Sequence, residues 1–139
     1  MGRGDRPQHV SWNSRMSAQE RPAPLRGEIW WAHFSFDPPE KNRPAVIVSP
    51  NGRNTHPRAN TVLAIPLSTS IQKVSPGQIL LPSGETGLQE DSVAWADNIG
   101  AIEKDRLKAP VPGHRPLSNS RICKLAELTR FAMGCAEVR

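Results

Sequence analysis

The sequence predicts a mainly β domain: a small, strongly bent sheet of antiparallel strands in barrel or sandwich form, with one C-terminal α-helix. From Glu28 onward, short apolar runs alternate with turn residues, which is typical of all-β domains. The chain has 139 residues and 14 prolines, about twice the usual share of proline, and this content disfavours a helical bundle. Only residues 118–133 have the apolar spacing of an amphipathic helix.

Three apolar runs predict the first half of the sheet. Residues 29–36 place alternate apolar side chains, ending with Phe36, on one face, and the Asp-Pro-Pro sequence that follows ends this strand. Residues 45–49 (AVIVS) are continuously apolar, which predicts a strand buried on both faces. Residues 61–67 predict the third strand, in which Pro66 requires an edge position or a bulge.

The second half is expected to contain shorter elements. Residues 78–81 predict a short strand, residues 92–102 a long strand with even apolar spacing, and residues 103–107 one helical turn. Polar or Pro- and Gly-rich connections separate the elements, at 51–60, 83–87 and 109–116. These elements place the barrel at residues 26–108.

The C-terminal helix begins after either of two serines, because Ser118 and Ser120 can each cap it. Gly134 can end it. Its apolar stripe consists of Ile122, Leu125, Leu128, Thr129 and Ala132. At the other end of the chain, residues 1–25 are polar, basic and without periodicity. We therefore expect a flexible basic N-terminal tail followed by one folded domain at 26–139.

The cysteines and the hydropathy indicate a cytoplasmic protein. Cys123 and Cys135 lie in the helical segment about 18 Å apart, which is too far for a disulfide, so we expect free thiols and a reducing compartment. No apolar run approaches the roughly 20 residues of a membrane span. The N-terminal segment lacks the apolar stretch of a secretory signal.

The net charge of +5 is unevenly distributed. Residues 1–27 and 110–139 each carry +3, whereas residues 28–109 carry −1. Within that middle region, the stretch from residue 41 to residue 84 has no carboxylate and five cations: Lys41, Arg43, Arg53, Arg58 and Lys73. Such a stretch is either a solvated basic face or a site for a polyanion, and charge alone does not decide between them.

Common catalytic and metal-binding motifs are absent from the sequence. There is no Cys-x-x-Cys or His-Glu-x-x-His, and the four histidines are isolated from one another, so we expect neither a metal nor a cofactor. No glycine-rich phosphate loop follows a strand, and Gly-x-Ser-x-Gly is missing. Aromatic residues make up only 5% of the chain, which disfavours base stacking as the main mode of binding nucleic acid.

Four motifs occur in order along the chain: RGEIW at 26–30, RPAVIVS at 43–49, AIPLST at 64–69 and GLQEDSVA at 87–94. Together with DNI at 97–99 and KDRL at 104–107, they resemble the MazF/PemK (Kid) toxin family over about residues 26–107. The resemblance implies an SH3-like, CcdB-like barrel that forms a homodimer. It also implies a toxin that cleaves single-stranded RNA (mRNA) at short sequences without a metal and is neutralised by an acidic segment of its antitoxin.

Metal-independent RNA cleavage uses the 2′-hydroxyl of the substrate as nucleophile, so the protein must stabilise a pentacovalent phosphorane. The planar guanidinium of Arg43 suits this task, and the position of Arg43 at the start of a buried strand fixes its backbone with the side chain directed outward. A hydroxyl donor beside it is expected from Ser68 or Thr69, since this family position carries Ser or Thr. Alignment of the following residues 71–73 favours Ser68.

Contacts to the RNA are expected from the carboxylate-free stretch, through Lys41, Asn42, Arg53, His56, Arg58, Gln72 and Lys73. Because arginine is a poor general base, His56 is also an accessory candidate for proton transfer. The segment 37–43 is shorter than the corresponding family loop and lacks its glycines. Asn42 and Glu40 can replace the missing polar contacts, although an ordinary turn carboxylate is the favoured interpretation of Glu40.

Three functions are compatible with these features. The first is a sequence-specific endoribonuclease, the toxin of a toxin–antitoxin pair, and the pairing of Arg43 with a strand-end hydroxyl favours it. The second is a toxin that inhibits gyrase on the same barrel, as CcdB-like proteins do. The third is a noncatalytic RNA-binding barrel, which the shortened loop at 37–43 favours.

Overall fold

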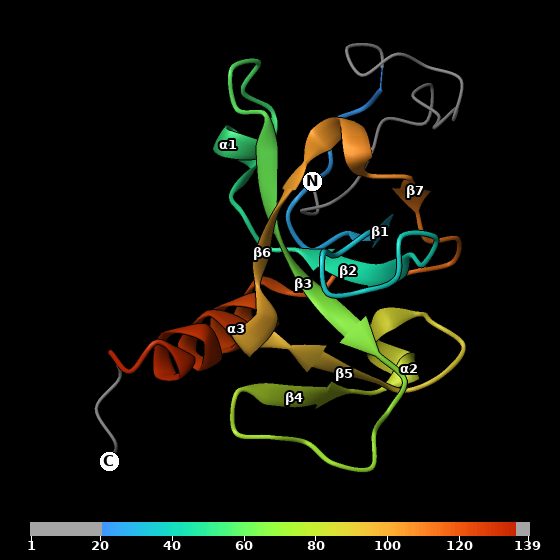
Figure 1. The fold of residues 1–139 in the computed structure, drawn as a ribbon, viewed down its shortest axis with the longest axis vertical. Coiled ribbons are helices and arrows are strands. Elements are labelled where there is room, and N and C mark those ends of the chain that lie inside the picture. Colours follow the sequence, from blue (N-terminus) through green and yellow to red (C-terminus); the bar gives the residue numbers. More distant parts are fainter. Residues whose placement is uncertain (1–20, 136–139) are drawn as a thin grey trace.

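The computed structural model describes residues 21–135 of the chain, and within this range the sheet has seven strands. Every strand pair is antiparallel. The strand order is β4-β5-β3-β2-β1-β7, and β6 pairs with β3 (Figure 1). The strands are β1 (Ile29–Ala32), β2 (Arg43–Ile47), β3 (Thr61–Ser68), β4 (Gln78–Leu81), β5 (Ser92–Trp95), β6 (Gly100–Glu103) and β7 (Ala109–Pro110). The predicted mainly β fold is confirmed.

The central strand is β3, and its two ends carry the features discussed below. One edge of β3 pairs with β2, while the other edge pairs with β6 at its start and β5 at its end. Pro66 is therefore not on an edge strand. The Val48 N–H donates to the Leu63 carbonyl, so the backbone polar groups of residue 63 face β2. Because these groups alternate along a strand, the backbone nitrogen of residue 66 faces the other edge of β3. There the missing N–H of Pro66 falls between the β6 and β5 pairings.

The long strand predicted at 92–102 is interrupted. The 3₁₀ turn η1 (Ala96–Asn98) separates β5 from β6. Ala94 pairs with Leu67 and Gly100 pairs with Ala64, so residues 95–99 lie opposite residues 65–66. The additional residues on the 95–99 side bend the chain, so that the segment 92–103 stays paired with β3 where the sheet bends.

Three other segments also differ from the prediction. β1 ends at Ala32 because the chain turns at 35–36, and Phe36 is 48% exposed although the alternation placed it on the buried face. The loop predicted at 51–60 begins with the short helix α1 (Asn51–Asn54), and the turn predicted at 83–87 begins with the short helix α2 (Ser83–Thr86). The connection predicted at 109–116 begins with the two-residue strand β7. The helical turn expected at 103–107 is the 3₁₀ helix η2 (Lys104–Arg106).

The core forms two clusters, one on each face of the sheet. Val46 belongs to the cluster that packs under the C-terminal helix, while Ala45 and Ile47 belong to the cluster around Trp30. All three β2 side chains are fully buried, which confirms the strand predicted to be buried on both faces. Burial of both faces explains why this strand has no polar alternation.

The C-terminal helix α3 (Asn119–Ala132) has the predicted position. Ser118 is its cap, because its hydroxyl accepts a hydrogen bond from the Arg121 N–H at 3.2 Å. Ile122 and Leu125 are buried, whereas Ala132, which the predicted stripe included, is exposed. Leu128 and Thr129 are half-buried.

Residues 1–20 of the predicted tail and residues 136–139 lie outside the described range. Residues 21–25 lie against the barrel: Pro24 is buried, and Arg21 Nη1 donates to the Leu107 carbonyl at 3.2 Å. Cys123 and Cys135 are exposed free thiols, as predicted. Within residues 21–135, no helix has the length and apolar character needed to cross a bilayer.

Candidate active site

Arg43, the first residue of β2, forms a two-point ion pair with Asp37. Its Nε donates to one carboxylate oxygen at 2.7 Å and its Nη2 to the other at 2.6 Å. Only 10% of the Arg43 side chain and 5% of the Asp37 side chain are exposed. β1 and β2 pair up to Ala32 and Arg43, so the connecting residues 33–42 fold back and bring Asp37 onto the guanidinium.

Two aromatic rings cover the Arg43 guanidinium. Its carbon lies 5.3 Å from the centre of the Phe36 ring and 5.0 Å from that of Trp95, within the range of cation–π attraction. Phe36 in turn stacks on Phe34 at 5.5 Å. The expectation that Arg43 points freely outward is therefore wrong. A planar guanidinium packs its faces against rings while its edge binds a carboxylate, so it can be buried here without losing its charge.

Asp37 is a member of this site that the sequence interpretation treated only as a turn residue. Hydrogen bonds from Arg43 hold the pKa of the Asp37 carboxyl below its ordinary value, against the effect of burial, and the charges of Arg43, Lys41 and His33 act in the same direction. The carboxylate is thus ionised at neutral pH. An acidic residue six positions before an Arg-Pro strand start, across a short connection, was the available signal.

Ser68 lies across from Arg43 at the end of β3. Ala45 pairs with Pro66, and the same register extended by two residues places Arg43 opposite Ser68. Arg43 Nη1 also donates to the carbonyl of Leu67 at 3.4 Å. Ser68 is half-buried, its hydroxyl oxygen accepts from the Ser70 N–H at 3.1 Å, and Thr69 is exposed. The structure therefore brings the predicted guanidinium and hydroxyl to one end of the sheet.

The residues predicted to contact RNA divide between the two ends of β3. Exposed residues near Arg43 come from the connection before β2 and the loop after β3, and they are Lys41, Asn42, Gln72 and Lys73. Residues near the start of β3 come from α1 and the following loop, and they are Arg53, His56 and Arg58. Glu40 is exposed on the first of these segments. β3 has eight residues, about 25 Å, so one copy of the chain does not gather these groups into a single patch (Figure 1).

Local hydrogen bonds define the group at the start of β3. Arg53 Nη2 donates to the Thr61 hydroxyl at 2.8 Å. The Arg58 N–H donates to His56 Nδ1 at 3.0 Å, so this ring nitrogen is an acceptor. His56 lies at the opposite end of β3 from Arg43 and cannot exchange a proton with the same phosphate in one copy. Among residues 21–135, no group of three or more His, Cys, Asp or Glu side chains is arranged to hold a metal.

Comparisons with known proteins give matches that cover most of the chain. The family model described as PemK-like, MazF-like toxin of type II toxin–antitoxin systems matches residues 25–128. Endoribonuclease MazF9 of Mycobacterium tuberculosis is 37% identical over 94 residues, 62% of this chain and 78% of that protein. A mycobacterial endoribonuclease solved with its cognate antitoxin has a TM-score of 0.63 and 27% identity over 84% of this chain and 100% of that one.

A second solved endoribonuclease from a mycobacterial species gives the same TM-score of 0.63, at 25% identity, over 84% of this chain and 97% of that one. The family match spans the whole sheet and most of α3, including Asp37, Arg43 and Ser68. The chain therefore belongs to the PemK-like, MazF-like toxins of type II toxin–antitoxin systems.

Proposed function

We propose that this toxin endoribonuclease cleaves single-stranded RNA, mRNA in particular, at short sequences and without a metal ion. The 2′-hydroxyl of the substrate attacks the adjacent phosphorus, and the products carry a 2′,3′-cyclic phosphate and a 5′-hydroxyl. Translation stops because the messages are cut. The observation that carries the proposal is the Arg43 guanidinium, fixed by Asp37 and hydrogen-bonded to the Leu67 carbonyl next to Ser68, in a chain of this family.

The chemistry assigns a role to each of these groups. Negative charge develops on the non-bridging phosphate oxygens during the attack, and a preorganised guanidinium stabilises it. Asp37 holds the Nε and Nη2 atoms of Arg43, while Nη1 is directed to the Leu67 carbonyl beside Ser68. A phosphate bound on the Nη1 side is shared by Arg43 and the Ser68 hydroxyl, with Thr69 next to it.

RNA reaches this side of Arg43 only when its cover moves. Phe36 belongs to the connection between β1 and β2 and is 48% exposed, so a base of the substrate can replace its ring against the guanidinium. Lys41 and Asn42 on the connection before β2, and Gln72 and Lys73 on the loop after β3, are exposed and bind the adjoining backbone of the RNA.

We further propose that the chain acts as a homodimer in the cytoplasm with an antitoxin partner. A dimer can join the basic groups at the two ends of β3 into one path. The solved relative in complex with its cognate antitoxin supports an antitoxin partner here. An acidic antitoxin segment suits the cations near Arg43, and the two exposed free thiols agree with a reducing compartment.

The test is incubation of the purified chain with a mixed single-stranded RNA pool in EDTA, followed by analysis of the fragment ends. We expect cleavage to continue in EDTA and to leave cyclic phosphate or its hydrolysed form at one end and a hydroxyl at the other. Cleavage that stops in EDTA and returns with magnesium would contradict the mechanism.

Substitution of Arg43 tests the assigned residue. Arg43→Ala is expected to lower the cleavage rate a hundredfold or more, about 3 kcal/mol of transition-state stabilisation. Because Arg43→Ala leaves the buried Asp37 unpaired, Arg43→Lys is the companion variant: it keeps the charge and the fold but cannot donate the same fork of hydrogen bonds, so it restores little activity. Arg106→Ala, an exposed arginine on η2, is the matched control. Near wild-type cleavage by folded Arg43→Lys would exclude this role.

The burial of Arg43 favours one alternative, a noncatalytic RNA-binding barrel. A guanidinium fully engaged by Asp37 and two rings also fits a purely structural role. This alternative predicts that the chain binds the RNA pool but forms no fragments. It also predicts that Arg43→Lys leaves the binding affinity unchanged and creates no cleavage.

A further inference from the structure

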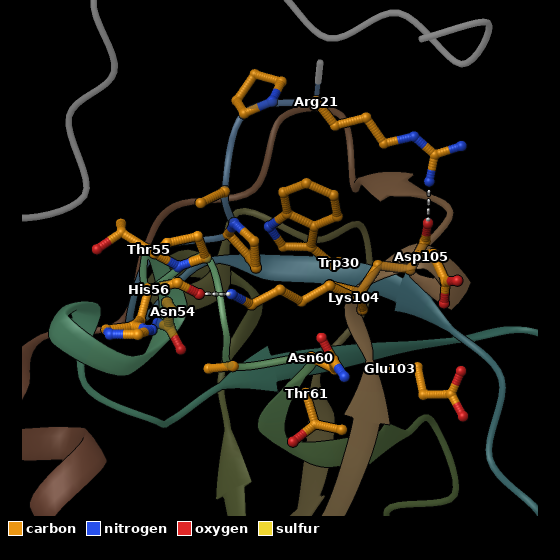
Figure 2. A pocket seen from close by; sticks show the side chains of 16 residues that line it. Arg21, Trp30, Asn54, Thr55, His56, Asn60, Thr61, Glu103, Lys104 and Asp105 are labelled. Atoms are coloured by element: carbon orange, nitrogen blue, oxygen red, sulfur yellow. Dashed lines mark hydrogen bonds between the residues drawn. The ribbon is translucent and has the colours of Figure 1, made fainter. Parts of the chain in front are cut away.

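A hollow lies far from Arg43, at the start of β3 (Figure 2). Its volume is about 850 Å³, in the range of about 300–1,000 Å³ that is typical of small-molecule sites. Three segments enclose it: residues 21–24, the loop from Asn54 to Thr61, and residues 103–107. The active-site residues Asp37, Arg43 and Ser68 are not among its lining residues.

One cation without an acidic partner, Lys104, lines this cavity, and a second, Arg53, lies close to it without lining the cavity. The half-buried Lys104 side chain extends along it in Figure 2, and its ammonium donates to the His56 carbonyl at 3.1 Å. Arg53 stands beside it and donates to the carbonyl and hydroxyl oxygens of Thr61. Neither forms an ion pair within residues 21–135. Burial first, and then the charge of Arg53, lower the pKa of Lys104. An anion beside the ammonium would act in the opposite direction, because an opposite charge favours the charged form of Lys104.

The uncharged part of the lining suits a flat heterocycle. Pro22 and Pro24 line the cavity from residues 21–24, and Pro57 lines it from the loop between Asn54 and Thr61. Asn60, which also lines the cavity, offers an amide that donates and accepts at once, as the edge of a nucleobase requires. Apolar walls with a few convergent polar groups are the usual composition of a site for a small organic ligand.

Two carboxylates distinguish between a nucleotide and an acidic peptide as the occupant. Glu103 and Asp105 line the cavity beside Lys104. A nucleotide brings a single phosphate, which Lys104 can hold, and the two carboxylates can accept hydrogen bonds from ribose hydroxyls or from the amino groups of bases. An acidic peptide brings several carboxylates along its length, which Glu103 and Asp105 would repel. Cations, carboxylates and apolar walls together therefore favour a nucleotide.

We propose that this cavity binds one nucleotide of an RNA strand, with its phosphate on Lys104, on the side of the nearby Arg53, and its base between the proline-bearing walls. The inference rests on the proposed function, because the nucleotide belongs to the substrate strand. The cavity lies about 25 Å from the Arg43 end of β3, so the bound nucleotide is separated by several others from the bond that is cut. Long RNAs thus gain affinity that short RNAs cannot.

The experiment compares 2′-O-methyl RNA pools of 4 and 12 nucleotides, which cannot be cleaved, on the full chain. Lys104→Gln keeps a donor for the His56 carbonyl but removes the charge. It is expected to lower the ratio of 12-mer to 4-mer affinity about tenfold. Arg106→Gln, the matched control, removes an exposed charge from the same turn and is expected to change this ratio less than twofold.

Titration of the four nucleoside monophosphates, followed by NMR, reads the cavity without any oligonucleotide. We expect their addition to shift the amide signals of Asn60 and Thr61 in wild type and not in Lys104→Gln. Equal shifts with inorganic phosphate would overturn the nucleotide assignment and leave a simple anion site. An equal loss of affinity in Lys104→Gln and Arg106→Gln would also overturn it.

Other occupants give different results. If Lys104→Gln weakened binding of an acidic antitoxin but not of RNA, or changed the mass of the particle in solution, the cavity would be a protein contact and the proposal would be wrong. Failure of the proposed function is separate. In that case wild-type protein cleaves no RNA pool, while the monophosphate titration still reports whether the cavity binds nucleotides.

Discussion

At the residue scale, Arg43 and Asp37 depend on one another. With 10% and 5% of their side chains exposed, neither charge keeps full hydration, and each replaces the lost water with the other. Removal of one partner leaves the other buried and uncompensated, which costs more than an exposed pair would. Asp37 thus acts on Arg43 by fixing the plane and the direction of its guanidinium.

The Asp37 pair makes stability depend on pH. Because the pKa of Asp37 is lowered in the folded chain, its contribution is complete above the ordinary Asp range and is lost as the pH falls through the lowered value. Asp37→Asn is expected to reduce the free energy of unfolding at pH 7 by about 2 kcal/mol and to flatten its decline below about pH 4. Denaturant unfolding at pH 7 and pH 3 measures both effects.

The control for this prediction is Glu90→Gln, which removes an exposed carboxylate from a bend. It is expected to change the free energy of unfolding by less than about 0.5 kcal/mol at either pH. If Asp37→Asn unfolded with the same acid dependence as wild type, the pair with Arg43 would not be a source of stability.

The site could be predicted from the sequence only in part. Arg43 and Ser68 were found through motifs that mark strand ends, and strand register then brings them together. Asp37 and Lys104 were missed as site residues, because their importance comes from chain segments that fold back over them. His56 was grouped with Arg43 by its place in a basic stretch, and a charge count along the sequence does not show that β3 separates them.

At the scale of elements, β3 organises the molecule by pairing with three strands. Its end receives Arg43 from β2 and Trp95 from β5, while its start receives β6 and the cavity. The period-two pattern of residues 92–102 predicted extended backbone. It did not indicate that this segment pairs with the end of β3 through β5 and with the start of β3 through β6, with a 3₁₀ turn between the two pairings. The strand at 45–49 was predictable because burial on both faces requires a continuous apolar run. The terminal helix was predictable because burial of one stripe gives a helical spacing of apolar residues.

Gly87 provides a test of how the elements between β4 and α3 are held together. It ends α2 with a φ of +76°, and a Cβ there would lie 2.4 Å from the Gly113 carbonyl oxygen. Gly87→Ala is therefore expected to destabilise the fold by about 2 kcal/mol or more, through both strain and collision. Gly84→Ala in the same short helix meets nothing within 4 Å and is expected to be neutral or slightly stabilising.

Thermal and denaturant unfolding of the two glycine variants, measured side by side, provides the comparison. Both substitutions add one methyl group within four residues, so the difference reports backbone conformation and packing rather than composition. Equal stability of Gly87→Ala and Gly84→Ala would show that the contact between residues 87 and 113 does not constrain the fold.

At the scale of the whole molecule, the fold redistributes the charge that the sequence concentrates. The carboxylate-free stretch from 41 to 84 runs along both ends of β3, so one copy presents two basic regions about 25 Å apart. A strand of RNA that reaches both regions, in one copy or across a dimer, must release counterions at each. Salt dependence therefore measures how many of these cations lie on the RNA path.

The exposed cations Arg58 and Lys73, one from each region, supply the last prediction. We expect the logarithm of the RNA binding constant to fall linearly with the logarithm of salt concentration. The double variant Arg58→Ala/Lys73→Ala should reduce the slope by about 1.4 per chain, or about 0.7 for each lost phosphate contact on a single strand. Lys108→Ala/Lys124→Ala, which removes two exposed cations from outside both regions, should lower affinity little and leave the slope unchanged.

Light scattering at micromolar concentration supplies the stoichiometry for this measurement. In the proposed dimer, one RNA strand that spans both copies makes twice as many phosphate contacts. The Arg58→Ala/Lys73→Ala variant should then reduce the salt-dependence slope by about 2.8 per dimer. A monomer that shows the full loss of slope would mean that one strand passes both ends of β3 in a single copy, and the shared path between two copies would be wrong. Equal slopes in the two double variants would place the RNA elsewhere on the surface.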